Sequence, residues 1–199
     1  LALVKFRFHQ SDLPTLPAGF SKYILIFDNT SPNFPSFSTS NAQIYEISDV
    51  GGGFYETKVN VVDDAFMTIG VLKPQASFVN VEAFAIEGDP APDSTVYVNK
   101  VYARLNYIPT SMVKVDFSFS DLTATLSSDY GYLNSDVNNG ITFPPGVQQV
   151  PIRIWVKNDV VLEDNPSTES FLINLELGSN TTAGMGIGEN SQHTFTIYD

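Results

Sequence analysis

Hydrophobic and polar residues alternate with a period of two along much of this chain. In residues 113–120, Val113, Val115, Phe117 and Phe119 alternate with lysine, aspartate and serine. Residues 171–177 follow the same pattern, with an apolar side chain at every second position. Successive side chains of a strand point to opposite faces, so each segment predicts a strand with one face in a core and one in water. No stretch has the 3.6-residue period of an amphipathic helix.

Similar segments recur at short intervals, separated by glycine, proline and asparagine, which favour turns. The pattern therefore predicts an all-β protein. The expected strands of the first part are residues 3–9, 22–27, 42–47, 54–61 and 66–71. Those of the second part are residues 77–86, 95–106, 113–120, 140–143, 150–157, 170–177 and 193–198.

The best candidate for a domain boundary lies at residues 73–75. Pro74 follows a predicted strand and cannot donate a hydrogen bond to a sheet. The 199 residues are enough for two ordinary domains, each with its own core. We therefore expect two tandem antiparallel β-sandwich domains, at residues 1–74 and 75–199. Five strands in the first also fit a domain that lacks a strand before Leu1.

The formal net charge of −12 is unevenly distributed. Residues 1–75 contain five basic and seven acidic side chains, whereas residues 76–199 contain five basic and fifteen acidic ones. An acidic chain repels phosphate backbones, which argues against nucleic acid as a partner. Acidic side chains concentrated in the loops of one half indicate either divalent-cation sites or a soluble surface.

Cysteine is absent, which excludes disulfides, zinc–thiolate sites and a cysteine nucleophile. An extracellular domain without disulfides needs another source of rigidity, and bound calcium is a common one. No run of 18 apolar residues occurs, so we expect no membrane insertion. The chain begins at Leu1 rather than methionine, and we expect it to be a piece of a longer protein.

Five motifs of the second part occur in the order typical of one known family. They are SDLTATLSSDY (120–130), ITFPPG (141–146), NDVVLED (158–164), ESFLINLEL (169–177) and FTIYD (195–199). Residues 75–199 thereby resemble the Calx-beta domain, an immunoglobulin-like β-sandwich repeat whose acidic loops often hold calcium. The resemblance implies an immunoglobulin-like sandwich for the second domain, and we expect the same class of fold for the first.

The same resemblance implies a Ca²⁺ site at one end of the second sandwich. Its ligands would be carboxylates from separate loops, which suit the six to eight oxygens that calcium prefers. Asn158 stands where the family has the first aspartate of its Asp-Asp pair. The alternative is that Asp129 and Glu163 cap turns by accepting backbone N–H groups. The candidate ligands are Glu87, Asp129, Asp159, Glu163, Asp164 and Asp199.

The first part is similar to a β-repeat of giant surface adhesins of gliding bacteria. The motifs that carry this similarity are DLPTLPAGFSKYIL (12–25), GGGFYE (51–56) and FMTIG (66–70). Residues 28–34 depart from the Asp-Gly-Asp-Phe loop that is frequent in that repeat, which weakens any calcium site in this part.

Residue types that could support catalysis are few. His9 and His193 lie in predicted strands of different domains, with no serine or cysteine motif beside them. The GMGIG segment (184–188) lacks the strand–loop–helix context of a phosphate loop and is expected to be a hairpin connection. Alternation places Trp155 on the side of its strand away from Ile154 and Val156, where it could stack on a sugar or cover a neighbouring surface.

Together these features predict a non-catalytic segment of a large bacterial adhesin at the extracellular cell surface. It would act as a stiff spacer, stabilised by calcium, with neighbouring repeats of the same chain and surface glycans as its partners. An alternative is a carbohydrate-binding or accessory module of a secreted polysaccharide-degrading enzyme. A third, weaker alternative is an enzyme in its own right.

Overall fold

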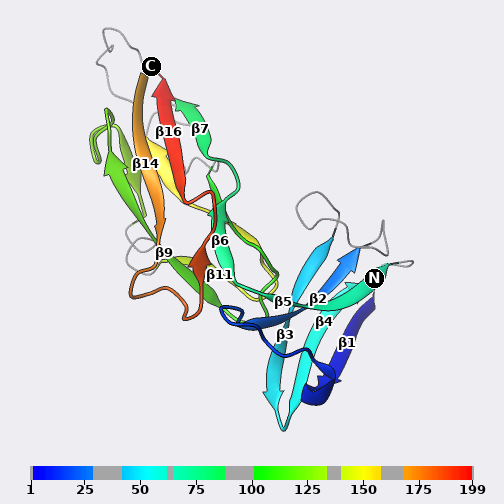
Figure 1. The fold of residues 1–199 in the computed structure, drawn as a ribbon. Coiled ribbons are helices and arrows are strands. Elements are labelled where there is room, and N and C mark those ends of the chain that lie inside the picture. Colours follow the sequence, from blue (N-terminus) through cyan, green and yellow to red (C-terminus); the bar gives the residue numbers. More distant parts are fainter. Residues whose placement is uncertain are drawn as a thin grey trace. The chain divides into compact units, whose positions relative to one another are not determined.

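Strands form nearly all the regular structure in the described part of the chain (Figure 1). The computed structural model describes residues 2–28, 42–61, 65–87, 101–133, 140–157 and 168–198. Within these residues the only helix is the 3₁₀ turn η1 (Gln10–Asp12). The chain divides into two compact units, and the first change of unit falls between Pro74 and Gln75. The prediction of an all-β protein is confirmed.

The first unit is built on an antiparallel sheet with the strand order β1-β4-β3-β2-β5. Strand β3 pairs with β2 through its first half and with β4 through its second half, and its register with β4 shifts between Asp49 and Gly51. A strand shared in this way lets one sheet fold over into two packed halves. The strands are β1 (Ala2–His9), β2 (Lys22–Asp28), β3 (Gln43–Gly51), β4 (Phe54–Val61) and β5 (Phe66–Leu72).

Apolar side chains from both halves form the core of the first unit. Leu25 and Phe27 of β2, Ile47 of β3 and Val59 of β4 are buried together. Aromatic rings join the halves edge to face: Phe6 contacts Phe27 with ring centroids 5.9 Å apart, and Tyr23 contacts Tyr55 at 5.3 Å. Strand β2 does not alternate, because its residues from Ile24 to Asp28 are all buried.

Residues 106–112 and 144–148 also belong to the first unit. Ile108 adds to the free edge of the first half of β3, where its N–H donates to the Ile44 carbonyl (2.6 Å) and its carbonyl accepts the Glu46 N–H (3.1 Å). The Glu46 carboxylate is buried and forms an ion pair with the ammonium group of Lys22. It also accepts hydrogen bonds from the N–H and from the hydroxyl of Thr110 (3.0 Å each). These contacts hold residues 106–112 as an integral part of the unit.

The second unit contains a five-stranded sheet with the order β11-β9-β14-β16-β7. In Figure 1, β14, β16 and β7 lie side by side in this sheet. The pairing of β7 with β16 is parallel, whereas the others are antiparallel. Its strands are β7 (Glu82–Ile86), β9 (Val113–Asp121), β11 (Ile141–Phe143), β14 (Thr168–Glu176) and β16 (Gln192–Tyr198).

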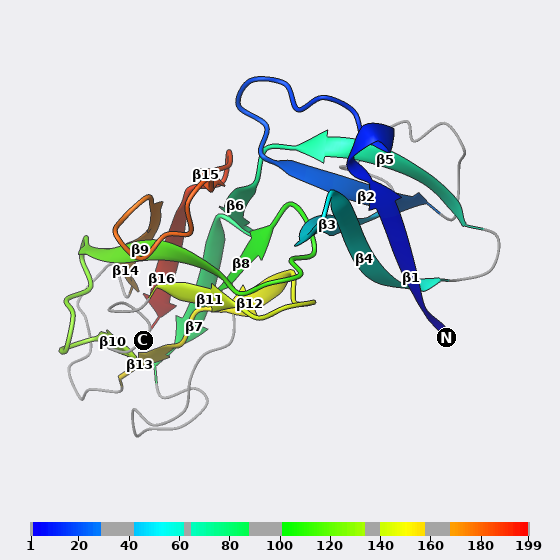
Figure 2. The ribbon, with the colours of Figure 1, turned by 90° about the horizontal axis from the view of Figure 1, so that it is seen from below.

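A second layer of this unit has the strand order β12-β8-β6-β15, with a separate β10–β13 pair (Figure 2). Stacked aromatic rings join the layers. The ring centroids of Tyr130 and Phe171 are 3.7 Å apart, and those of Phe119 and Tyr132 are 4.3 Å apart. The strands are β6 (Gln75–Phe78), β8 (Tyr102–Leu105), β10 (Tyr130–Tyr132), β12 (Gln149–Pro151), β13 (Ile154–Val156) and β15 (Gly186–Ile187). The unit is therefore a β-sandwich.

Two segments that the pattern predicts as single strands are each divided in two. Residues 77–86 become β6 and β7, which pair in different sheets. Residues 150–157 become β12 and β13, with Ile152 and Arg153 between them. The period-two pattern continues through the second break, where Ile152, Ile154 and Val156 are all buried. It does not continue through the first, where burial passes from the even-numbered Phe78 to the odd-numbered Ala85. Part of the GMGIG segment, expected to be a hairpin connection, forms β15 and pairs in parallel with β6.

Candidate functional site

Strand ends that flank the predicted calcium ligands meet at one end of the second unit. Ile86, the last residue of β7, pairs with Tyr198 of β16, and Tyr198 also pairs with Thr168, the first residue of β14. Tyr130 begins β10 opposite Val156 of β13. Because the Tyr130 ring stacks on Phe171, three residues into β14, the β10–β13 pair lies at this same end.

The structure describes two of the six predicted ligands, Glu87 and Asp129. Glu87 directly follows β7, and its N–H donates to the carbonyl of Tyr198 (2.8 Å). Asp129 directly precedes β10. Both lie at the end of the unit where β14 begins and β16 finishes. The other four ligands, Asp159, Glu163, Asp164 and Asp199, lie outside the described residues.

Backbone contacts of Asp129 shape the loop between β9 and β10. One carboxylate oxygen of Asp129 accepts the Thr125 N–H (2.6 Å), and the Asp129 N–H donates to the Thr125 carbonyl (3.0 Å). The Asp129 carbonyl accepts the Lys157 N–H (2.8 Å), and the ammonium group of Lys157 donates to the Ser127 carbonyl. Asp129 thus caps a turn, as the alternative interpretation expects. A carboxylate with one oxygen in such a bond still has lone pairs for a cation.

Asp121 is a further carboxylate of this loop that the predicted ligand set omits. Its Oδ1 accepts the Tyr130 hydroxyl (2.6 Å) and the Leu126 N–H (3.2 Å). Burial raises the pKa of the Tyr130 hydroxyl, and the hydrogen bond to Asp121 raises it further. Asp121 therefore fixes the buried tyrosine that follows Asp129 in the chain. The signal in the sequence is the Ser-Asp pair that opens the 120–130 motif.

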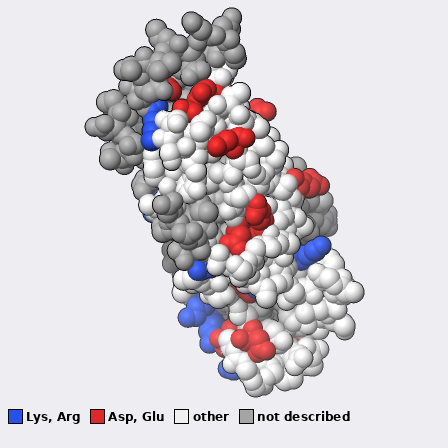
Figure 3. Space-filling model, turned by 90° about the vertical axis from the view of Figure 1, so that its left-hand side faces the viewer, with Lys and Arg blue, Asp and Glu red and all other residues white. Residues whose placement is uncertain are grey.

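Metal-binding side chains do not form a complete site within the described part of the chain. No group of three or more His, Cys, Asp or Glu residues that could hold a metal occurs there. The donor chemistry of Glu87 and Asp129 nevertheless suits calcium, which binds carboxylate oxygen. On the face shown in Figure 3, acidic side chains form several separate patches rather than a single one.

The two histidines occupy structural positions. His9 precedes η1, and its ring contacts the Ser11 hydroxyl (2.8 Å), two residues away at the exposed start of that turn. His193 is buried, with Nδ1 2.7 Å from the Asn80 carbonyl oxygen. Burial lowers the pKa of the His193 imidazole. Among the described residues, the serine that contacts His9 is exposed and His193 contacts no serine.

Trp155 lies on the side of β13 away from the core, as alternation predicts. Ile154 and Val156 are buried, whereas Trp155 is half-buried and packs over Gly131 of β10. A Cβ atom at Gly131 would lie only 2.4 Å from the indole ring. The ring therefore covers its own sheet.

No described helix is both long and apolar enough to cross a membrane.

Comparisons with known proteins identify solved structures that are similar to this chain. The chain is similar to the crystal structure of CBD12 from CALX1.2, with 22% identity over 63% of this chain and 45% of that one, and a TM-score of 0.46. It is also similar to the apo form of the Calx CBD1 domain, with 21% identity over 64% of this chain and 98% of that one, and a TM-score of 0.47. The chain thus spans less than half of the CBD12 structure. No curated protein matches the chain.

The second unit is matched by a family model as well. Residues 74–199, well over half of the chain, match the model described as the Calx-beta domain. This confirms the resemblance that the five motifs indicate. The chain belongs to the Calx-beta domain family.

Proposed function

We propose that this chain is a non-catalytic, calcium-binding segment of a large bacterial cell-surface adhesin. The observation that carries the calcium proposal is the convergence of strand ends in a Calx-beta domain. Glu87 follows β7, Asp129 precedes β10, and Asp199 follows Tyr198, the last residue of β16. Asp159, Glu163 and Asp164 belong to the connection between β13 and β14, whose flanking strands end and begin at this same end of the unit.

Glu87 and Asp129 would hold the ion together with carboxylates of these connections. Calcium would supply positive charge and join loops that are distant in sequence. Residues 76–199 carry fifteen acidic and five basic side chains, so carboxylates gathered without a cation repel one another. A bound ion removes that repulsion and stabilises the folded domain by an amount that grows with the logarithm of the ion concentration above its dissociation constant.

The proposed adhesin context rests on the first part of the chain. Its motifs are similar to those of surface-adhesin repeats, and its strands form a β unit of their own. The absence of cysteine fits an extracellular repeat that gains rigidity from cations. In this proposal the chain acts as a stiff spacer between neighbouring repeats.

Calorimetric titration of the whole chain with calcium tests the binding proposal. We expect saturable binding, which Asp129→Asn weakens at least tenfold because it removes a ligand charge. Glu189→Gln serves as the matched control, since Glu189 is an exposed carboxylate next to β16's first residues, away from the proposed loops. An absence of heat and of competition with a calcium dye would overturn the proposal.

A further inference from the structure

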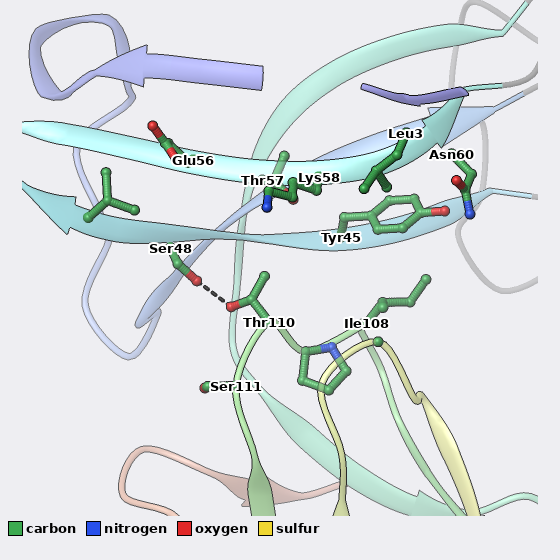
Figure 4. Close-up of a pocket in the computed structure, with 13 residues that line it drawn as sticks. Leu3, Tyr45, Ser48, Glu56, Thr57, Lys58, Asn60, Ile108, Thr110 and Ser111 are labelled. Atoms are coloured by element: carbon green, nitrogen blue, oxygen red, sulfur yellow. Dashed lines mark hydrogen bonds between the residues drawn. The ribbon is translucent and has the colours of Figure 1, made fainter. Parts of the chain in front are cut away.

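A pocket of about 660 Å³ lies on the outer face of the first unit (Figure 4). Strands β1, β3 and β4 form one wall, with Leu3, Tyr45, Lys58 and Asn60 (Figure 4). Residues 108–111 and Gly146 form the facing wall. All thirteen lining residues belong to the first unit. The volume is in the range of small-ligand sites.

Hydrogen bonds fix the facing wall in place. Thr110 donates its N–H and its hydroxyl to the buried Glu46 carboxylate, and its hydroxyl also contacts that of Ser48 (Figure 4). The Gly146 N–H donates to the Pro109 carbonyl (2.7 Å). A wall held at this many points is preformed, which lowers the entropic cost of binding a ligand.

Two lysines face each other across neighbouring strands at the pocket, which lowers the stability of the fold. Lys5 of β1 and Lys58 of β4 stand directly opposite each other in the sheet register, an arrangement that is destabilising for like charges. Glu56, which also lines the pocket, pairs with Lys5 (2.6 Å) and Arg7 (3.3 Å) and not with Lys58, so its negative charge is already compensated. Lys58 forms no ion pair or hydrogen bond with any described residue. In a chain with net charge −12, an uncompensated lysine beside a second lysine favours an anionic ligand.

The remaining lining groups suit a sugar ring. The Asn60 amide and the Ser111 hydroxyl can each donate and accept, and neither has a hydrogen-bond partner among the described residues. Leu3, Ile108 and Pro109 offer apolar surface for the C–H face of a pyranose. The Tyr45 hydroxyl donates to Gln43 (2.6 Å), which orients its ring at the wall.

We propose that this pocket binds an acidic saccharide. Its carboxylate pairs with the Lys58 ammonium group, its hydroxyl groups bond Asn60 and Ser111, and its ring packs against Ile108 and Pro109. The site belongs to the first unit and does not depend on calcium. It would give the proposed adhesin segment a direct contact with acidic surface glycans.

Binding of a galacturonic acid trisaccharide to the whole chain, measured by calorimetry with chelator present, tests the proposal. We expect saturable binding that weakens as salt rises, because the ion pair is screened. A neutral galactose trisaccharide should bind at least tenfold more weakly. Lys58→Gln should also lose at least tenfold in affinity, whereas Lys73→Gln, an exposed lysine of the same unit outside the pocket, should bind like the parent chain.

Thermal stability distinguishes a binding role of Lys58 from a structural one, because a lysine needed for folding would lower the melting temperature when it is replaced. Removing one of two opposed lysines relieves repulsion, so Lys58→Gln should melt at or above the temperature of the parent chain while losing the acidic sugar. Equal affinity for the acidic and neutral trisaccharides, an absence of binding to either, or equal binding by the Lys58→Gln and Lys73→Gln variants would each overturn the proposal.

Discussion

The buried Glu46 carboxylate should be the most important single polar group of the first unit. It pairs with the Lys22 ammonium group and accepts two hydrogen bonds from Thr110, each 3.0 Å long. The Glu46 side chain is 8% exposed and that of Lys22 is 23% exposed. Glu46→Ala therefore leaves an ammonium group largely buried without its partner and removes the anchor of residues 106–112.

The expected cost follows from the burial of this pair. Removing one partner of a buried ion pair costs about 3–5 kcal/mol. Partial exposure of Lys22 places the effect near the lower limit, so we expect a loss of about 3 kcal/mol. Glu56→Ala is the control, because its partners Lys5 and Arg7 are more than half exposed. Exposed pairs contribute about 0–1 kcal/mol.

The assay must report on the first unit alone. Trp155, the only tryptophan, lies in the second unit, so its fluorescence is unsuited to this measurement. Amide hydrogen exchange in β2 and β3 gives the local free energy of opening directly. Glu46→Ala should lower it by about 3 kcal/mol and leave β14 and β16 unchanged. Equal effects of Glu46→Ala and Glu56→Ala on β2 and β3 would refute this reasoning.

Two further predictions concern the second unit. Burial lowers the folded-state pKa of His193 below its ordinary value of 6.5, an effect that the Asn80 carbonyl and Glu82 oppose more weakly. The unfolded chain therefore takes up the proton first, and the unfolding free energy should fall as pH drops through 6.5; an equal pH dependence for His193→Asn would contradict this. Gly131→Ala should force the Trp155 indole away, cost about 1–3 kcal/mol and shift its fluorescence to the red; an unshifted spectrum would contradict this packing.

The sequence predicts the strands of this protein better than it predicts their partners. Strand β9 is recognised from its alternation because one face is buried along most of its length. The break within residues 150–157 leaves no trace in the pattern, because Ile152, Ile154 and Val156 stay buried at every second position while the strands pass to another sheet. Within residues 77–86 the buried positions do change parity, from Phe78 to Ala85, but apolar residues occupy both sets of positions, so the sequence alone does not reveal the change. Sheet switching depends on contacts distant in sequence, which a local period does not record.

The candidate site divides in a similar way. The resemblance to the Calx-beta domain indicates Glu87 and Asp129, and the described strand ends place them at the same end of the unit. The role of Asp121 depends on the hydroxyl of Tyr130, nine residues away across a folded loop, and no spacing rule predicts it. The sequence does not predict the pocket of the first unit either, because residues 108–111 are distant from β1 and β4 along the chain.

Thermal unfolding of the whole chain with calcium and with chelator tests the calcium claim most directly. At one hundred times the dissociation constant, a bound ion stabilises the folded domain by about 2.7 kcal/mol. We predict that millimolar calcium raises the melting temperature of the second unit, reported by Trp155 fluorescence, by several degrees. Magnesium should do less, because it requires a tighter octahedral site, and Asp129→Asn should reduce the calcium shift while Glu189→Gln preserves it. An identical melting curve in calcium and in chelator would contradict the account and leave these carboxylates as turn caps.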